Sequence, residues 1–218
     1  MKKWQSITRS AVLILLSSMT MTLTAQDVMP IKLPAPRTEG GRPLMQVLQD
    51  RQSVRSFKPD TLSLQLLSDL CWAAFGINRP ESGGRTAPSA RNRQEIDVYV
   101  ALQKGLFLYE AQTHQLNLIT DQDLRSHTGT QPFVGEAPLN LVYVADLVKM
   151  GDGPEETKIP WANADAGFIS ANVYLFCASE GLGTVVRGMV DREKLAPLMQ
   201  LRPDQRIILA QTVGYPKE

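Results

Sequence analysis

Residues 138–145, Pro-Leu-Asn-Leu-Val-Tyr-Val-Ala, are the most informative stretch of this chain for its fold. The run is almost continuously apolar and contains the branched and aromatic side chains that strands favour. A strand of this kind is expected where both faces of a sheet are covered, because neither row of its side chains then meets water. The stretch therefore predicts a buried central strand with helices on both sides of its sheet.

The segments on either side supply the other elements of an α+β fold. Strands are predicted over residues 96–102, 105–110, 116–119 and 206–213, with a hairpin turn at 113–115. Helices are predicted over 63–77, 162–179 and 191–199, and a shorter helix begins at Leu44, runs into residues 51–57 and stops before Pro59. Surface loops are expected at 80–94 and 150–160. Helices bracketing a central sheet make a three-layer α+β domain.

Composition excludes several classes of protein. The 218 residues suit one domain with a sizeable core, and 23 basic against 22 acidic residues give no electrostatic footprint for nucleic acid. Neither of the two His has a second ligand at metal-binding spacing, so a structural four-ligand zinc site is not expected. His114 and His127 are expected on the solvated surface, and Cys71 and Cys177 are expected as buried free thiols, with a disulfide as the alternative.

The N-terminus reads as a secretory signal peptide over residues 1–25. Three basic residues precede a short apolar run, and Ala25 offers a small residue for cleavage. The predicted protein is therefore exported, in the periplasm, without stable membrane insertion, and its mature net charge of −2 disfavours a polybasic membrane contact. Residues 26–43, rich in proline and glycine, are expected as an extended lead-in, either a disordered spacer or a segment packed on a partner subunit. The domain proper spans residues 44–218.

Three segments offer binding groups, although no nucleophile elbow, Walker loop or metalloprotease motif is present. Arg51, Ser53 and Arg55 at alternate positions suit a phosphate, or else form a solvated basic turn. Asn92 and Gln94 match the edges of a planar heterocycle, or else belong to a polar loop before the next strand. Residues 181–188, with three glycines, allow backbone N–H groups to approach a ligand, or else form a helix C-cap and a turn.

The ordered set of these segments resembles the FMN-dependent nitroreductase superfamily over residues 44–216. Residues 67–79, followed by Arg-Thr-Ala-Pro-Ser-Ala at 85–90, are most similar to its SagB-type branch, and the ending Val-Gly-Tyr-Pro at 213–216 also matches. The resemblance implies a three-layer fold with a mostly antiparallel sheet, and FMN bound at the interface of an obligate homodimer. Trp72, Trp161 and Phe133 are expected in the core unless they line the pocket.

The same resemblance assigns the site. It implies that Arg51 and Ser53 hold the phosphate and ribityl chain with Arg55 close by, and that Pro88 and Ser89 pack against the flavin. Asn92 would bind the pyrimidine edge, with Gln94 beside it. The backbone amides of Arg187 and Gly188 would face flavin N5 and O4, where they stabilise the reduced ring. Lys217 or the Arg187 side chain would complete the phosphate site.

The function implied is that of an FMN oxidoreductase, in which the flavin carries the chemistry and no catalytic side chain is needed. Hydride or electron transfer would follow a ping-pong course between a small-molecule donor and a small flat acceptor, such as a nitroaromatic or a quinone. Because nicotinamide cofactors are cytosolic, an exported enzyme would need another donor. The alternative is a non-catalytic nitroreductase-like protein that binds flavin or another small ligand.

Overall fold

The middle layer of the computed structural model, which describes residues 30–217, is a seven-stranded sheet. Its order is β1-β6-β5-β4-β7-β9-β8, and all neighbouring strands are antiparallel. The eight residues of β7 are all buried at its centre, as residues 138–145 predict. The strands are β1 (Ile31–Lys32), β4 (Ile96–Leu102), β5 (Gly105–Glu110), β6 (Gln115–Thr120), β7 (Leu139–Asp146), β8 (Gly183–Arg187) and β9 (Gln205–Gly214).

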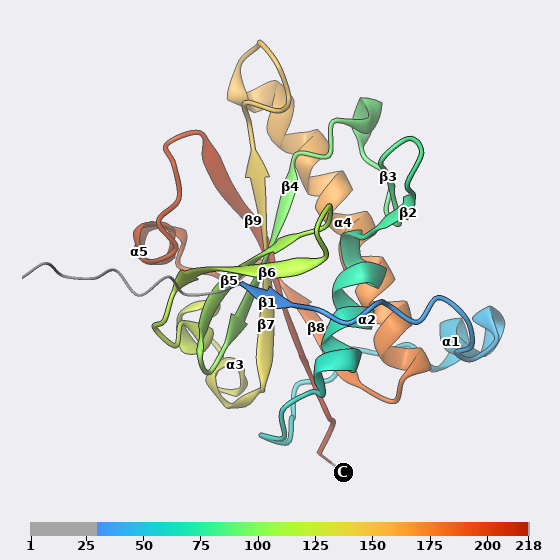
Figure 1. The fold of residues 1–218 in the computed structure, drawn as a ribbon. Coiled ribbons are helices and arrows are strands. Elements are labelled where there is room, and N and C mark those ends of the chain that lie inside the picture. Colours follow the sequence, from blue (N-terminus) through green and yellow to red (C-terminus); the bar gives the residue numbers. More distant parts are fainter. Residues whose placement is uncertain (1–29, 218) are drawn as a thin grey trace, which may run out of the picture.

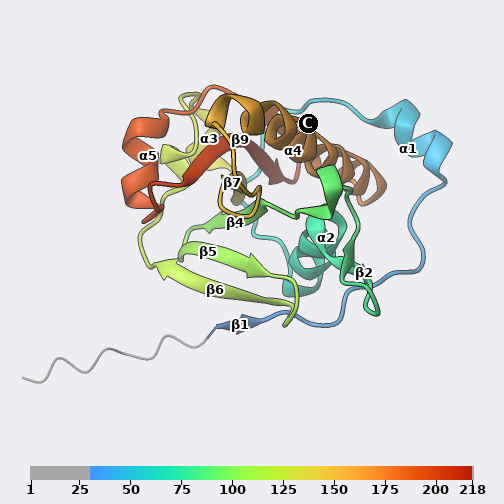
Figure 2. The same ribbon diagram turned by 90° about the horizontal axis from the view of Figure 1, so that it is seen from above.

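Helices cover both faces of this sheet (Figure 1). On one face, α2 (Leu64–Phe75) and α4 (Glu155–Ser179) pack their buried sides on the strands and form the larger core. On the other face, α5 (Arg192–Leu198) closes a second core around Leu195 and Met199. The short helix α1 (Leu44–Asp50) lies apart from the sheet, at the outer edge of the molecule beside α4 (Figure 2). The predicted three-layer α+β fold is confirmed.

Shorter elements complete the described chain. They are the small hairpin of β2 (Ile77–Arg79) and β3 (Gly84–Arg85), the 3-10 turns η1 (Ala90–Asn92) and η2 (Arg125–His127), and α3 (Phe133–Glu136). None of the helices within residues 30–217 has the length and apolar character to cross a bilayer. The predicted signal peptide lies outside the described residues. Cys71 and Cys177 are buried and free, as expected, and burial raises the pKa of both thiols.

The predicted helix from Leu44 through residues 51–57 is wrong in its second half. Helix α1 ends at Asp50, and the chain continues in an extended form. The backbone N–H of Val54 donates to the Thr184 carbonyl at 3.0 Å, and Phe57 forms a bridge with Pro216. Hydrogen-bond partners more than a hundred residues away thus replace the helical ones, because a backbone donor at a packed site must be satisfied somewhere.

Two further helix boundaries differ from prediction. Helix α2 ends at Phe75, Gly76 takes an extended conformation with φ −71° and ψ 167°, and Ile77 enters β2. Helix α4 begins at Glu155, earlier than the predicted residue 162, and contains Pro160. Pro160 has no backbone N–H, so the carbonyl of Glu156 loses its helical hydrogen-bond donor. Glu156 is exposed, and water can therefore take the place of that donor.

The lead-in packs on its own domain, which neither prediction for it anticipated. Strand β1 pairs with β6, and the backbone and guanidinium of Arg37 donate to the buried Asp69 carboxylate at 2.7–2.8 Å. The prediction that His114 lies on the solvated surface is wrong, because the packed lead-in partly buries its ring. Its ring bonds Ser68 Oγ at 2.7 Å and Tyr109 OH at 2.9 Å, and burial lowers its pKa. His127 is exposed, as expected.

Candidate functional site

The extended segment 51–57 lies against β8, where the two stretches of backbone approach each other closely. A Cβ at Gly183 would lie 2.8 Å from the Val54 side chain, so only glycine admits Val54 at this distance. Alternate residues of an extended chain point to opposite sides. Packing Val54 inward therefore leaves Ser53 and Arg55 on the exposed side.

Tyr174 of α4 joins this segment to β8. Its hydroxyl lies 2.9 Å from Ser53 Oγ and accepts the backbone N–H of Val186 at 3.0 Å. The guanidinium of Arg51 lies over the Tyr174 ring, 5.3 Å from its centroid. The structure thus brings Arg51 and Ser53 next to the strand that ends at Arg187. Sequence reasoning missed Tyr174, although a phenol in a buried helix signals a polar partner.

Arg55 and Arg51 leave positive charge on this surface. Within residues 30–217 neither guanidinium has a carboxylate within salt-bridge distance. Both side chains are exposed, and the Ser53 hydroxyl lies between them in sequence. Guanidinium groups without a carboxylate partner, next to a hydroxyl, are suited to bind a phosphate.

Gly188 is exposed, but Arg187 is buried and pairs with Ala210 of β9. Its guanidinium turns inward and donates to the Thr128 carbonyl at 2.7 Å and to Asn140 Oδ1 at 3.0 Å. Burial lowers its pKa to about 10. A Cβ at Gly188 would meet no atom within 4 Å, so the space beside this backbone is open. The Arg187 side chain is therefore wrong as a second phosphate ligand.

Lys217 is the remaining cation predicted for the phosphate. Its backbone N–H donates to the Ser56 carbonyl at 3.0 Å, which places it beside the segment 51–57. Its ammonium lies 3.5 Å from Glu136, with both side chains about half exposed. An exposed pair of this kind is weak, so the ammonium can exchange its partner for a phosphate at little cost.

The loop with Pro88, Ser89, Asn92 and Gln94 is rigid. The N–H of Ala90 donates to the buried Asp165 carboxylate at 2.8 Å, and Ser89 Oγ accepts the Gln94 N–H at 2.9 Å. The Gln94 side chain is used within the loop, where it accepts from Arg85 and donates to Gly83 and Asn92. Pro88 and Asn92 are exposed. Positive φ angles at Arg91, Asn92 and Gln94 are the kind of strain that functional sites store.

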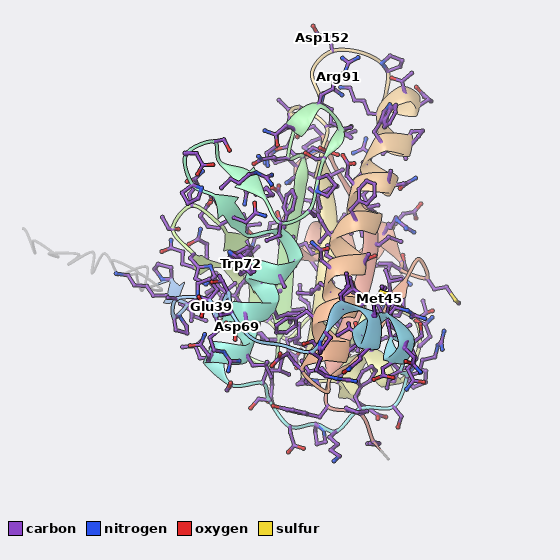
Figure 3. The ribbon with its side chains drawn as sticks, turned by 90° about the vertical axis from the view of Figure 1, so that its right-hand side faces the viewer. Glu39, Met45, Asp69, Trp72, Arg91 and Asp152 are labelled. Carbon is purple, nitrogen blue, oxygen red and sulfur yellow. The ribbon has the colours of Figure 1, made fainter. Side chains whose placement is uncertain are left out.

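This loop does not meet the Arg51–Ser53 group within one chain. The loop binds Asp165, whereas Ser53 binds Tyr174, nine residues further along α4. At ~1.5 Å per residue the two anchor points are separated by ~13.5 Å along the helix. Figure 3 shows the same separation, with Arg91 at one end of α4 and Met45 of α1 near the other. The structure therefore forms two half-sites at different levels of one helix.

An exposed apolar stripe runs along α4 between the half-sites. We name it the α4 seam, and its spacing of three and four residues is that of a coiled-coil face. Trp161 is 57% exposed and Phe168 is 48% exposed. The prediction that Trp161 lies in the core is therefore wrong, whereas Trp72 and Phe133 are partly buried. The seam consists of Trp161, Ala164, Phe168, Ala171 and Leu175.

A cavity of about 580 Å³ adjoins the seam at Leu175, between the lead-in, α2 and α4. Glu39 of the lead-in and Asp69 and Trp72 of α2 line it and are labelled in Figure 3. Its wall combines an indole with charged groups, as ligand pockets do. Among the described residues, no three His, Cys, Asp or Glu side chains gather as a metal site.

Comparison with known proteins identifies the family. The profile of the nitroreductase family matches residues 48–215. The chain belongs to the nitroreductase family. A crystal structure of a nitroreductase from Ralstonia eutropha JMP134 is 48% identical, with a TM-score of 0.83, over 87% of this chain and 90% of that one.

Two other relatives agree with this assignment. A nitroreductase of Methanocaldococcus jannaschii is 26% identical over 84% of this chain and 91% of its own length. The Escherichia coli microcin synthetase McbBCD complex contains a chain with a TM-score of 0.69 at 17% identity, over 97% of this chain and 85% of that one. A likeness at that identity shows the shared fold. The predicted membership of the nitroreductase superfamily is thus confirmed.

Proposed function

We propose that this nitroreductase-family protein is an FMN-dependent oxidoreductase that passes electrons from a small donor to a small flat acceptor, such as a nitroaromatic or a quinone. The observation that carries the proposal is the convergence of Arg51, Ser53 and the end of β8 on Tyr174. Donors for an anion and open backbone for a ring edge thereby lie side by side. The donor set suits a flavin mononucleotide.

The residues present fit each part of this group. Arg51 and Arg55 carry charge without a carboxylate partner in the described chain, and Ser53 adds a hydroxyl, so together they would hold the phosphate and ribityl chain. The open backbone at Gly188 would donate an N–H group to the ring edge. Such fixed dipoles stabilise negative charge that develops in a reaction. FMN supplies the reversible two-electron chemistry.

A second copy of the chain would complete the site. The loop with Pro88, Ser89 and Asn92 is anchored at Asp165, nine residues before the Tyr174 that holds Ser53, so the two half-sites do not touch within one chain. Pairing two molecules along the α4 seam would bury the exposed Trp161 and Phe168. Two-fold symmetry would then bring the loop of one subunit towards the flavin ring held by the other. We therefore propose a homodimer with two equivalent sites.

The cellular compartment of the protein determines which electron donors are available to it. We propose that residues 1–25 direct export to the periplasm, where cytosolic nicotinamide cofactors are absent, so a different small reductant would serve there. Mixing the oxidised protein with several candidate donors, including NADH as a comparison, and following reduction of the flavin would identify that reductant. Localisation of a tagged full-length chain to the cytosol would overturn this part of the proposal.

The absorbance of the purified mature protein between about 300 and 550 nm tests the cofactor. We expect two flavin bands and release of FMN on denaturation. A colourless protein that also fails to take up added FMN would overturn the proposal. A protein that holds FMN but transfers no electrons from dithionite to any quinone or nitroaromatic would instead be a flavin-binding module. Arg51→Ala should weaken FMN binding by ~1.5–3 kcal/mol, the worth of a charge-assisted hydrogen bond.

A further inference from the structure

The Tyr174 hydroxyl connects the two parts of the proposed flavin site. It is within hydrogen-bond distance of Ser53 Oγ on one side and of the Val186 N–H on the other, at 2.9 and 3.0 Å. One hydroxyl of α4 thus links the segment that carries the phosphate donors to the strand whose end faces the ring. The following inference rests on the proposed function.

The directions of these hydrogen bonds follow from the number of protons and their acidity. The Val186 N–H can only donate, so the Tyr174 oxygen accepts it. Tyr174 has a single proton of its own, and the Ser53–Tyr174 hydrogen bond is compatible with donation from either hydroxyl. A phenol is a stronger acid than an alkyl hydroxyl, which favours donation from Tyr174 to Ser53. With its oxygen accepting from Tyr174, Ser53 keeps its own proton free to point outward.

We propose that Tyr174 is a positioning residue that turns the Ser53 hydroxyl proton towards the phosphate monoester of the flavin. The relay runs from the Val186 N–H through the Tyr174 hydroxyl to the Ser53 hydroxyl and ends on a phosphate oxygen. Successive hydrogen bonds polarise one another, so Ser53 becomes a better donor to an anion. Without Tyr174, the Ser53 hydroxyl can rotate and present a lone pair to the phosphate.

The Tyr174 ring has a separate role that a substitution can preserve. Arg51 lies over its face at 5.3 Å, a cation–π contact that phenylalanine also offers. Tyr174→Phe therefore removes the relay and keeps the support for Arg51. Tyr109→Phe is the matched control, because it also deletes a tyrosine hydroxyl that is hydrogen-bonded, to His114, away from the site.

The test compares FMN with riboflavin, which lacks the phosphate, by fluorescence titration of the full mature chain. We expect Tyr174→Phe to weaken FMN binding about five- to tenfold, the net worth of one hydrogen bond, and to leave riboflavin binding unchanged. Ser53→Ala should have a similar effect. The double variant should be no weaker than Ser53→Ala alone, because the relay acts only through Ser53. Tyr109→Phe should bind both flavins as the parent does.

Three results would overturn the inference. They are an unchanged FMN affinity in Tyr174→Phe, an equal loss for riboflavin, and additive losses in the double variant. If Tyr174→Phe does not fold, the variants Ser53→Thr and Ser53→Ala test the relay instead. The relay requires that Ser53→Thr retains the preference for FMN over riboflavin and that Ser53→Ala loses it. Wild-type protein that takes up neither flavin would overturn the proposed function together with the relay. Wild type that binds FMN with a Tyr174→Phe variant of equal affinity would overturn the relay alone.

Discussion

At the scale of single residues, the carboxyl group of Glu95 stands out. It is fully buried at the start of β4, and within residues 30–217 neither of its oxygens has a hydrogen-bond donor. Burial, together with the neighbouring Asp165 carboxylate, raises the pKa of Glu95 to about 7. Asp165 is the group that holds the Ala90 N–H. The protonation of Glu95 is therefore linked to the anchor of the loop that the proposed dimer brings to the flavin.

Replacing Glu95 with glutamine should remove a pH dependence. The pKa of Glu95 is about 7 in the folded chain against an ordinary 4.5, so the folded state binds more protons between these values. Stability is therefore highest below pH ~4.5 and is lost as pH rises to ~7. A glutamine amide at this position can donate to Asp165 at any pH. We expect Glu95→Gln to exceed the parent by ~1–3 kcal/mol at pH ~8 and to match it at pH ~5.

Thermal unfolding at both pH values checks this expectation, with Glu81→Gln at an exposed position as the control. Equal melting temperatures of parent and Glu95→Gln at the higher pH would contradict the assignment of this titration to Glu95.

Gly129 is required by the buried guanidinium of Arg187. A Cβ added at Gly129 would collide with Nη1 of Arg187, the same nitrogen that donates to the Thr128 carbonyl. We expect Gly129→Ala to destabilise the protein by ~1–3 kcal/mol, the usual cost of overpacking. Denaturant unfolding followed by circular dichroism measures the change. An unaltered midpoint would mean that the guanidinium moves aside without loss.

At the scale of elements, α2 shows how a local signal sets a boundary. Ser63 Oγ accepts the N–H of Leu66, so the helix begins where an N-cap residue precedes an apolar run. Its buried stripe includes Leu67, Leu70 and Ala74, as the four-residue spacing predicts. Both signals are local, which is why the start of this helix was readable from sequence. Its end, where Gly76 becomes extended and leads into β2, lies two residues before the predicted end at residue 77.

The N-cap can be tested directly. Ser63→Ala should destabilise the protein by ~1 kcal/mol because the Leu66 donor loses its partner. Ser63→Asp offers an acceptor at the same place and should restore the parent stability. Chemical denaturation of the two variants measures the difference. Equal stabilities for alanine and aspartate would show that water replaces the cap at no cost.

At the scale of the whole molecule, α4 organises the two half-sites and carries the seam. Its inward side packs on the sheet through Ile169 and Val173, while Trp161 and Phe168 point outward. Exposed apolar stripes of this kind mark interaction surfaces. The exposed Met45 of α1 lies beside α4, far from Arg91 (Figure 3). A dimer along the seam would bury the stripe and join the half-sites.

Phe168→Glu should therefore separate the dimer and empty the site at once. A carboxylate in the middle of the seam would have to be buried without a partner on association. We expect the parent to be a dimer with FMN, and Phe168→Glu to be a folded monomer with at most a tenth of the flavin. Light scattering and the absorbance of bound flavin measure both. Lys194→Glu, which adds a carboxylate to α5 on the opposite face, should leave both unchanged. A monomeric parent that holds FMN would refute the shared site.

The amino-acid sequence by itself determined the central strands, the burial of α2 and the nitroreductase family. The apolar continuity of residues 138–145 and the four-residue stripe within the predicted helix 63–77 are local patterns, so they can be recognised without knowledge of the partner elements. The ordered motifs at 85–90 and 213–216 indicated the family in the same way.

Only the tertiary structure decided how segment 51–57 folds, where the Arg187 side chain points and what Tyr174 joins. The backbone N–H of Val54 donates to a carbonyl of β8, which holds the segment extended. The Arg187 guanidinium donates to Thr128 and Asn140 in the interior, and Tyr174 is hydrogen-bonded to Ser53, 121 residues away in the chain. Backbone donors and buried polar groups must be satisfied by whatever lies nearby in space. Those neighbours are distant in sequence, so no local pattern could identify them.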